Sequence, residues 1–288
     1  MRALLVLVCM VFSLPSSVQA EDEPVVRWYN EHYPPTFISK GPYSGKGFGD
    51  KTLAFFLAQL PQFQHKVLQA NVHRAIVEMR ENDGVCIAGL FQTPERDVFM
   101  TFSKTVFRTL PNRLIILKNN FERFRPYVGE AGELDLVALL EQSDMTAGVI
   151  VDRVYSTRIN KLLTDHLGGS PRIVSPHPRY GALLHRGRIH YTFGFSYEAD
   201  YQFKELGIAD VYISISIEGE PKIVSSGIAC SDSEVGRAVI AAVDDIIDQQ
   251  GANPPYQRFY EEWLDEKALS DTRRYIGQMP PETRLRDD

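Results

Sequence analysis

The stretch CIAGLFQTPERDVFMTFSKTVF, residues 86–107, contains the pattern that decides the fold. It starts within an apolar run, VCIAGL (85–90), that is typical of a buried strand, and then enters a turn of the form Thr-x-x-Arg. On both sides of this stretch, apolar or β-branched runs bounded by turn residues alternate with segments of helical period. Such alternation predicts an α/β fold with mainly parallel strands.

Arg96, in the turn after this strand, is the clearest candidate for a ligand contact. A residue at the carboxyl end of a buried strand points into the crevice where open α/β sheets bind ligands, and a guanidinium matches the shape of a carboxylate. The Thr93 hydroxyl and backbone donors around Gly89 would complete the hydrogen bonds of that carboxylate. The alternative is a surface arginine paired with Glu95, Asp97 or another neighbouring acid.

The residues before this stretch read as a β-α-β-α-β unit. A short strand at Val25–Trp28 is followed by a loop rich in glycine and proline. Asp50 is placed to cap a helix that Pro61 stops, and Asn71 opens a second helix that leads to the strand at 85–90.

A second α/β unit follows from Arg113 onward. Its predicted strands are 113–117, 146–151, 172–175, 188–195 and 210–217, and its predicted helices are 134–141, 156–167 and 179–185. A returning strand at 222–230 leads to two closing helices, the first capped by Ser231, Asp232 or Ser233 and the second opened by Pro254-Pro255. The charged tail, 280–288, is predicted to be disordered.

Residues 1–20 predict a cleavable signal peptide. Arg2 precedes an apolar run from Ala3 to Leu14, and small residues lead up to Ala20, after which we expect cleavage. The run is shorter than the ~20 residues of a membrane span, so no membrane insertion is expected. Cys9 lies inside the run, where it does not suit a lipid anchor.

Charge and motifs exclude several classes of function. The net charge is −6, and it becomes −7 when the signal peptide, which contains Arg2, is cleaved off. No basic patch is interleaved with aromatic residues. We therefore expect no nucleic-acid partner. No Gly-x-Ser-x-Gly, His-Glu-x-x-His or phosphate-binding glycine loop is present, and the seven histidines are scattered. We expect no metal and no cofactor.

Cys86 and Cys230 are the two cysteines that remain after cleavage. In an oxidising compartment, a pair far apart in sequence is a disulfide candidate rather than a metal site. The alternative is two buried free thiols.

Residues 86–107 strongly resemble the signature of the type-3 family of bacterial periplasmic solute-binding proteins, the receptors of polar amino-acid uptake systems. In that signature, a strand ending in glycine leads to Thr-x-x-Arg and then to Phe-Ser. Further similarity lies in Trp28–Phe37, with its Tyr-Pro-Pro loop, in Gly45–Leu60, and in IACSDSEVGRAVIAAVDDII (228–247). The chain looks closest to an uncharacterised branch with cysteines at the two positions found here.

The resemblance implies a periplasmic binding protein-like (type II) fold, in which two α/β lobes joined by two hinge strands hold the ligand between them. Lobe one would comprise 25–114 plus 218–279, and lobe two 115–217. It also places the strands of Cys86 and Cys230 side by side, which favours the disulfide. We expect a monomer.

The resemblance further assigns Arg96 to the α-carboxylate of an amino acid and Tyr33 to a cover over its side chain. Asn30 stands where the family often has a polar contact, although loop packing would explain both residues equally well. At the start of a lobe-two helix, Tyr155 and Ser156 could hold an anion, since helix N-termini favour negative charge. Ordinary N-capping by Ser156 is the alternative.

The match fails on the late lobe-two strand, where many relatives carry an acid for the ligand's ammonium group. His190 stands where we look for that acid, and a neutral imidazole is a poor substitute for a carboxylate. We therefore hypothesise that the ligand is not a standard α-amino acid, or that Glu198 or Asp200 supplies the missing charge. The alternative for His190 is a strand residue that faces helices.

Two classes of function remain. The first is a binding protein without catalysis, which closes on a small polar, carboxylate-bearing ligand and delivers it to an ABC permease or reports it to a membrane sensor. The second is a periplasmic enzyme of the same fold, similar to cyclohexadienyl dehydratase, with Glu31 or Glu198 as the acid.

Overall fold

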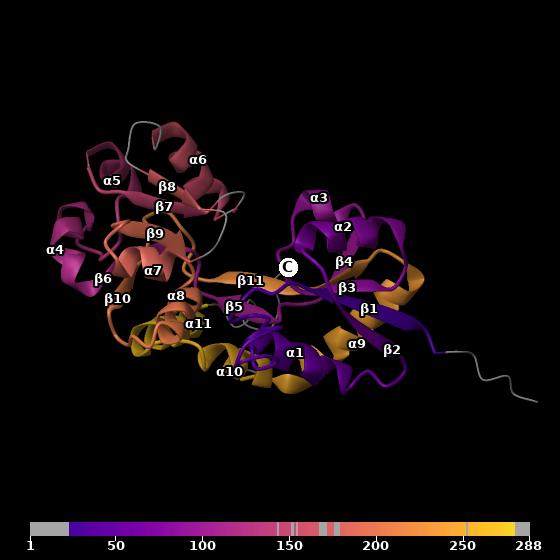
Figure 1. The fold of residues 1–288 in the computed structure, drawn as a ribbon. Coiled ribbons are helices and arrows are strands. Elements are labelled where there is room, and N and C mark those ends of the chain that lie inside the picture. The colour runs from indigo at the N-terminus through magenta and orange to yellow at the C-terminus, as the bar shows by residue number, and fades with distance from the viewer. Residues whose placement is uncertain are drawn as a thin grey trace, which may run out of the picture.

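The computed structural model describes residues 23–142, 144–150, 153, 155–166, 172–175, 179–251 and 253–279. The predicted signal peptide (1–20) and the predicted tail (280–288) lie outside these residues. Two sheets, one in each half of the molecule, form the framework (Figure 1). The predicted α/β class is confirmed.

The first sheet has the strand order β2-β1-β3-β11-β4, and β5 also pairs with β11. Strand β3 is parallel to β1 and antiparallel to β11, so it lies in the middle of the sheet. Its residues alternate between two cores, Cys86 and Ala88 facing one and Val85 and Ile87 the other. Burial on both faces explains its unbroken apolar run. The strands are β1 (Val25–Asn30), β2 (Gln64–Gln69), β3 (Val85–Leu90), β4 (Met100–Phe102), β5 (Phe107–Thr109) and β11 (Val224–Ser231).

Helices cover both faces of this sheet. Helix α2 (Val72–Glu81) packs on one face through Ala75 and Met79. On the other face lie α1 (Phe48–Leu57), α9 (Glu234–Gln250) and α10 (Pro255–Glu261). The short α3 (Pro94–Asp97) holds the turn after β3.

The second sheet has the order β10-β6-β9-β7-β8, and β9 runs parallel to β7. Helices α4, α5 and α6 contribute to the core on one face, and α7 and α8 to the core on the other. The strands are β6 (Arg113–Leu117), β7 (Ala147–Ile150), β8 (Arg172–Ser175), β9 (Tyr191–Gly194) and β10 (Tyr212–Ile215). The helices are η1 (Lys118–Asn120), α4 (Phe121–Phe124), η2 (Arg125–Tyr127), α5 (Leu136–Gln142), α6 (Thr157–His166), α7 (Tyr180–His185) and α8 (Ser196–Glu205).

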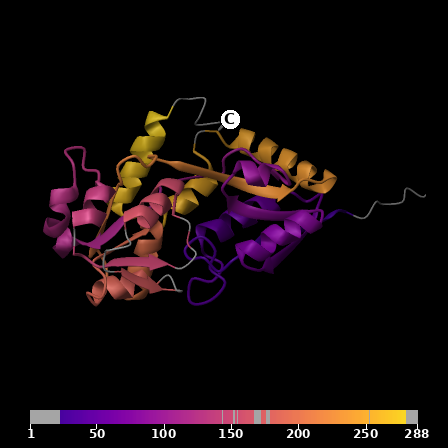
Figure 2. The same cartoon turned by 90° about the horizontal axis from the view of Figure 1, so that it is seen from above.

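The chain passes between the halves at 110–112 and again at 216–223, and β11 extends from this second passage across the molecule (Figures 1 and 2). The last helix, α11 (Glu266–Gln278), contacts the second half, where Asp271 forms an ion pair with Arg113 and Asp265 accepts a hydrogen bond from the Tyr212 hydroxyl. Helix α11 falls within the range 218–279 that the sequence analysis assigned to lobe one, although it contacts the second half. The lobe boundaries stay a prediction.

Cys86 and Cys230 form a disulfide, as predicted. They stand directly opposite each other in the antiparallel pair β3–β11, with their Cα atoms 4.1 Å apart. The bond joins residues 144 positions apart in sequence, so in the loop-entropy model it stabilises the fold by about 5 kcal/mol.

Three local expectations differ from the structure. Helix α1 starts at Phe48 with Gly47 as its N-cap, and Asp50 lies in the first turn, where its carboxylate accepts hydrogen bonds from the Gly47 and Ile38 amides. Helix α8 was not among the predicted elements. The chain also closes with three helices, α9, α10 and α11, where the sequence predicted two.

Candidate functional site

A cavity of about 590 Å³ lies between the two halves, at the carboxyl ends of their parallel strands. Strands β1 and β3 end beside it from one half, and β7 and β9 from the other, because parallel strands end at the same edge of a sheet. Eight of the residues that the sequence singled out line it: Asn30, Glu31, Tyr33, Gly89, Thr93, Arg96, Tyr155 and Ser156.

Arg96 enters the cavity from α3 and is partly buried. Its guanidinium donates a hydrogen bond to the carbonyl oxygen of Phe91. Within the described residues it forms no ion pair, so the predicted alternative of a salt bridge to Glu95 or Asp97 is not observed. Burial lowers the pKa of Arg96, although neighbouring Glu95 opposes the change.

Gly89 and Thr93 shape the wall next to Arg96. Gly89 has a φ of +83°, a left-handed conformation that side chains other than glycine rarely adopt, and it lies opposite an irregularity in β11 between Gly227 and Ile228. Thr93 is the N-cap residue of α3, and its hydroxyl bonds to the Glu95 carboxylate, which lowers the pKa of that acid.

Tyr33 and Asn30 come from the end of β1. The Asn30 side-chain oxygen accepts a hydrogen bond from Gln69 on the neighbouring strand, and Asn30 is buried. The Tyr33 hydroxyl bonds to the Glu198 carboxylate, which belongs to α8 of the second half. Burial, and then the Glu198 charge, raise the pKa of Tyr33 well above its ordinary value.

Tyr155 and Ser156 begin the segment that leads into α6. Ser156 accepts a hydrogen bond from the Ile159 amide at 2.9 Å, the capping contact that was the alternative interpretation, and it donates to Glu220. The Tyr155 hydroxyl accepts a hydrogen bond from the Ile150 amide at 3.0 Å, and burial raises its pKa. Both residues keep part of their surface in the cavity wall.

Arg153 is a lining residue that the sequence analysis did not identify. It forms a buried ion pair with Glu198, in which the side chains are 9% and 5% exposed and the closest N–O distance is 2.9 Å. Burial acts to lower the pKa of Arg153, but the Glu198 carboxylate outweighs it and raises the pKa. Arg153 lies three residues after the end of strand β7. The rule that ligands bind at strand ends, which identified Arg96, could therefore have identified Arg153 as well.

His190 lies at the opposite end of β9 from the cavity, so its interpretation as a ligand contact is corrected. Its Nδ1 accepts a hydrogen bond from the Thr146 amide at 2.8 Å, and burial lowers its pKa. The residue that follows β9 at the cavity is Phe195. Of the two acids proposed as substitutes, Glu198 reaches this region, whereas Asp200 faces Lys204.

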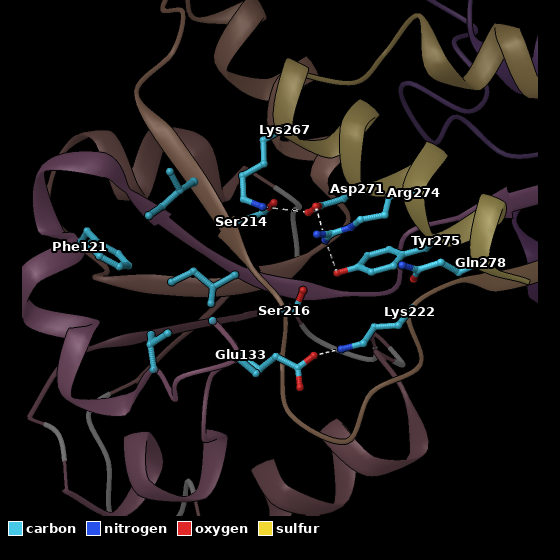
Figure 3. A pocket seen from close by; sticks show the side chains of 15 residues that line it. Phe121, Glu133, Ser214, Ser216, Lys222, Lys267, Asp271, Arg274, Tyr275 and Gln278 are labelled. Carbon is cyan, nitrogen blue, oxygen red and sulfur yellow. Dashed lines mark hydrogen bonds and ion pairs between the residues drawn. The ribbon is translucent and has the colours of Figure 1, made fainter.

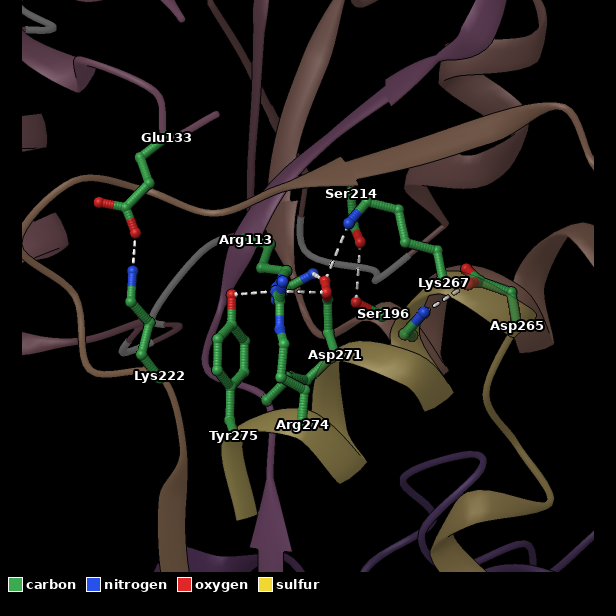
Figure 4. A network of polar contacts seen from close by, with 12 residues as sticks. Arg113, Glu133, Ser196, Ser214, Lys222, Asp265, Lys267, Asp271, Arg274 and Tyr275 are labelled. Atoms are coloured by element: carbon green, nitrogen blue, oxygen red, sulfur yellow. Dashed lines mark hydrogen bonds and ion pairs between the residues drawn. The ribbon is translucent and has the colours of Figure 1, made fainter. Parts of the chain in front are cut away.

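A second cavity of about 690 Å³ lies between β10, α11 and the turn before α5 (Figure 3). Its charged side chains bond to one another: Lys222 pairs with Glu133, and Lys267 and Arg274 pair with Asp271. Buried Arg113 donates to the same Asp271 carboxylate at 3.0 Å (Figure 4). Of these pairs, Arg113–Asp271 links α11 to strand β6 of the second half.

Among the described residues, no group of three or more histidines, cysteines or acids is arranged to hold a metal ion. No helix in the described part of the chain is long and apolar enough to cross a membrane.

Comparison with known proteins gives the fold. No family model and no curated protein matches the chain. Solved structures do match over most of its length. An ancestral cationic amino acid solute-binding protein has a TM-score of 0.62 at 15% identity, covering 84% of this chain and 96% of that one. The fold is that of a type II periplasmic binding protein.

Two further structures support this assignment. A putative L-cystine ABC transporter protein from Listeria monocytogenes has a TM-score of 0.60 at 13% identity, covering 85% of this chain and 97% of that one. An ancestral amino-acid-binding protein described as a precursor of cyclohexadienyl dehydratase has a TM-score of 0.57 at 16% identity, covering 84% and 95%. At such identities the similarity establishes the fold, as predicted from the sequence.

Proposed function

We propose that the chain is an exported solute-binding protein whose two halves close on a small, carboxylate-bearing ligand. The observation that carries the proposal is the Arg96 guanidinium, which lines the cavity between the halves without an ion pair among the described residues. A ligand carboxylate supplies the missing partner, and a bidentate pair with arginine fixes its orientation. The passages at 110–112 and 216–223 would act as the hinge of closure.

Export is supported by two features of the chain. Residues 1–20 have the pattern of a signal peptide, and the Cys86–Cys230 disulfide suits an oxidising compartment such as the periplasm. We propose an ABC permease or a membrane sensor as the partner, since both respond to closure of a hinge. A permease and an ATPase encoded beside the gene would favour uptake, and a membrane-bound signalling protein would favour sensing.

The hydrogen bonds of the two candidate acids, Glu198 and Glu31, favour binding over catalysis. Glu198, one of the two candidate acids, already accepts hydrogen bonds from Arg153, the Phe195 amide and Tyr33. A carboxylate held in this way is poorly placed to protonate a leaving group. Glu31 accepts a hydrogen bond from the Val72 amide at 3.2 Å.

The test is to purify the protein gently, identify the retained small molecule by mass spectrometry and measure its rebinding by calorimetry. Arg96→Ala is expected to weaken rebinding by about 100-fold, because it removes a charge-assisted, bidentate contact. Arg74→Ala, an exposed arginine of α2 outside the cavity, serves as the matched control.

Unchanged affinity in Arg96→Ala would refute the carboxylate grip and leave the fold assignment intact. The molecule recovered after incubation should also be chemically identical to the one added. A product of different mass would establish the enzyme alternative.

A further inference from the structure

Arg153 occupies a position in the cavity wall that is suited to a ligand's cationic group. Its guanidinium carbon lies 5.2 Å from the centre of the Tyr155 ring and 5.5 Å from that of Phe195. Its nitrogens donate to both Glu198 oxygens, at 3.2 and 2.9 Å, and to Asn112 at 3.2 Å. Aromatic rings combined with a carboxylate are what proteins use to hold an ammonium ion. Here the chain's own guanidinium fills that environment.

Glu198 is therefore not free to receive a second cation. Besides Arg153, it accepts hydrogen bonds from the Phe195 amide at 3.2 Å and from Tyr33. A ligand ammonium could reach it only by separating a buried ion pair, which leaves an uncompensated charge out of water. The ammonium would also stand beside the Arg153 guanidinium, and like charges repel strongly where water is excluded.

Apart from the Arg153–Glu198 pair, the described part of the wall offers an ammonium group no carboxylate without a hydrogen-bond partner. Among the described lining residues, Glu31 carries the only carboxylate, and it is engaged with the Val72 amide at the start of α2, where a helix N-terminus stabilises negative charge. Much of the remaining surface is aromatic. The rings belong to Tyr29, Tyr33, Phe37, Phe48, Phe91, Phe107, Tyr155, Phe195 and Tyr197.

We infer that the cavity selects carboxylates whose body is uncharged and largely apolar, without an ammonium group, and that Arg153 is the specificity-determining residue. Acids with a hydroxyl, a keto oxygen or hydrogen in place of the amino group belong to this class. The inference rests on the proposed function, because Arg96 holds the carboxylate while Arg153 excludes the cation.

Calorimetry with ligands that differ only at the second carbon tests this directly. The probes are L-phenylalanine, L-3-phenyllactate and 3-phenylpropionate, with L-leucine, its 2-hydroxy analogue and 4-methylpentanoate as a second set. The ammonium-free member of each set should bind at least ten-fold tighter. Amino acids that bind equally well or better would overturn the inference while leaving the proposed function in place. No binding by any of these carboxylates would contradict both.

Variants separate specificity from a merely structural role. Arg153→Met removes the charge, frees Glu198 and should shift the preference at least ten-fold toward the amino acid. The double variant Arg153→Met/Glu198→Gln should show no such shift, because it lacks the freed carboxylate. If Arg153→Met weakened all probes equally, or if the double variant shifted as much, Arg153 would not determine specificity.

Two more variants serve as controls for the role assigned to Arg153. Arg153→Lys keeps the charge and is expected to keep the preference for ammonium-free acids, which provides a test if Arg153→Met does not fold. Glu31→Gln should leave the preference unchanged. Tight binding of amino acids that is lost in Glu31→Gln would identify Glu31 as the ammonium partner and overturn the inference.

Discussion

At the residue scale, His190 acts as a neutral hydrogen-bond acceptor. Its Nδ1 accepts from the Thr146 amide, and burial, then the Arg123 charge, lower its pKa. The unfolded chain, with an ordinary histidine pKa of about 6.5, takes up this proton first as the pH falls. Stability is therefore expected to fall as the pH drops through about 6.5 toward the lowered pKa of the folded state.

His190→Asn keeps an acceptor for Thr146 without a titrating ring, so its stability should vary less between pH 7.5 and 5.5. Melting temperatures across this range measure the effect. His32, whose pKa burial also lowers, should maintain a residual slope. His73→Asn, at an exposed position of α2, is the control and should behave as the parent does. Equal slopes for the parent and His190→Asn would contradict the prediction.

Single residues could be predicted from the sequence where a strand end was clear. Arg96 follows an unbroken apolar strand, and the rule that ligands bind at strand ends placed it in the cavity. Arg153 obeys the same rule, but no surrounding motif distinguished it from a surface arginine. His190 was misplaced because the start of β9 was taken for the end that faces the ligand.

At the element scale, the two helices of ten or more residues that escaped prediction, α8 and α11, did so for opposite reasons. Helix α8 buries residues around most of its circumference, including Tyr197, Glu198 and Ala199, so it shows no single apolar stripe. Helix α11 buries only small or polar residues, Ala268, Asp271 and Thr272, so its pattern resembles a solvated segment. In both helices, tertiary contacts override the periodicity on which sequence analysis depends.

The Asp271 carboxylate of helix α11 has three cationic partners. It bonds Arg113 and Lys267 at 3.0 Å and Arg274 at 2.8 Å, and the Arg113 side chain is 1% exposed (Figure 4). Asp271→Asn would leave this buried guanidinium without its counter-charge and is expected to lower the free energy of unfolding by about 3 kcal/mol. Urea titration measures the change.

Arg274→Gln is the matched control for Asp271→Asn. Its side chain is 55% exposed, and partners of this kind contribute less than about 1 kcal/mol. Equally small losses in the two variants would show that α11 does not depend on the Asp271–Arg113 pair.

At the scale of the whole molecule, the aromatic side chains of α8 join the halves beneath the cavity. The Tyr197 ring lies 5.3 Å from Phe48 and 5.6 Å from Tyr260, both in the first half, and stacks on Phe195 at 5.0 Å. The sequence predicted two lobes and a ligand between them. It could not show how the halves touch, because the contacts of Tyr197 with Phe48 and Tyr260 join residues that are far apart in the sequence.

Loss of the Tyr197 ring should therefore loosen the relation between the halves. Tyr197→Ala is expected to lower the free energy of unfolding by about 3–5 kcal/mol, as for other large buried rings, and to increase the radius of gyration of the ligand-free protein in small-angle scattering. Tyr191→Ala is the control, because that buried ring contacts Phe124 and Phe193 within the second half and should cost stability without changing the radius of gyration. An unchanged radius of gyration in Tyr197→Ala would mean that the passages at 110–112 and 216–223, rather than the α8 rings, set the arrangement of the halves.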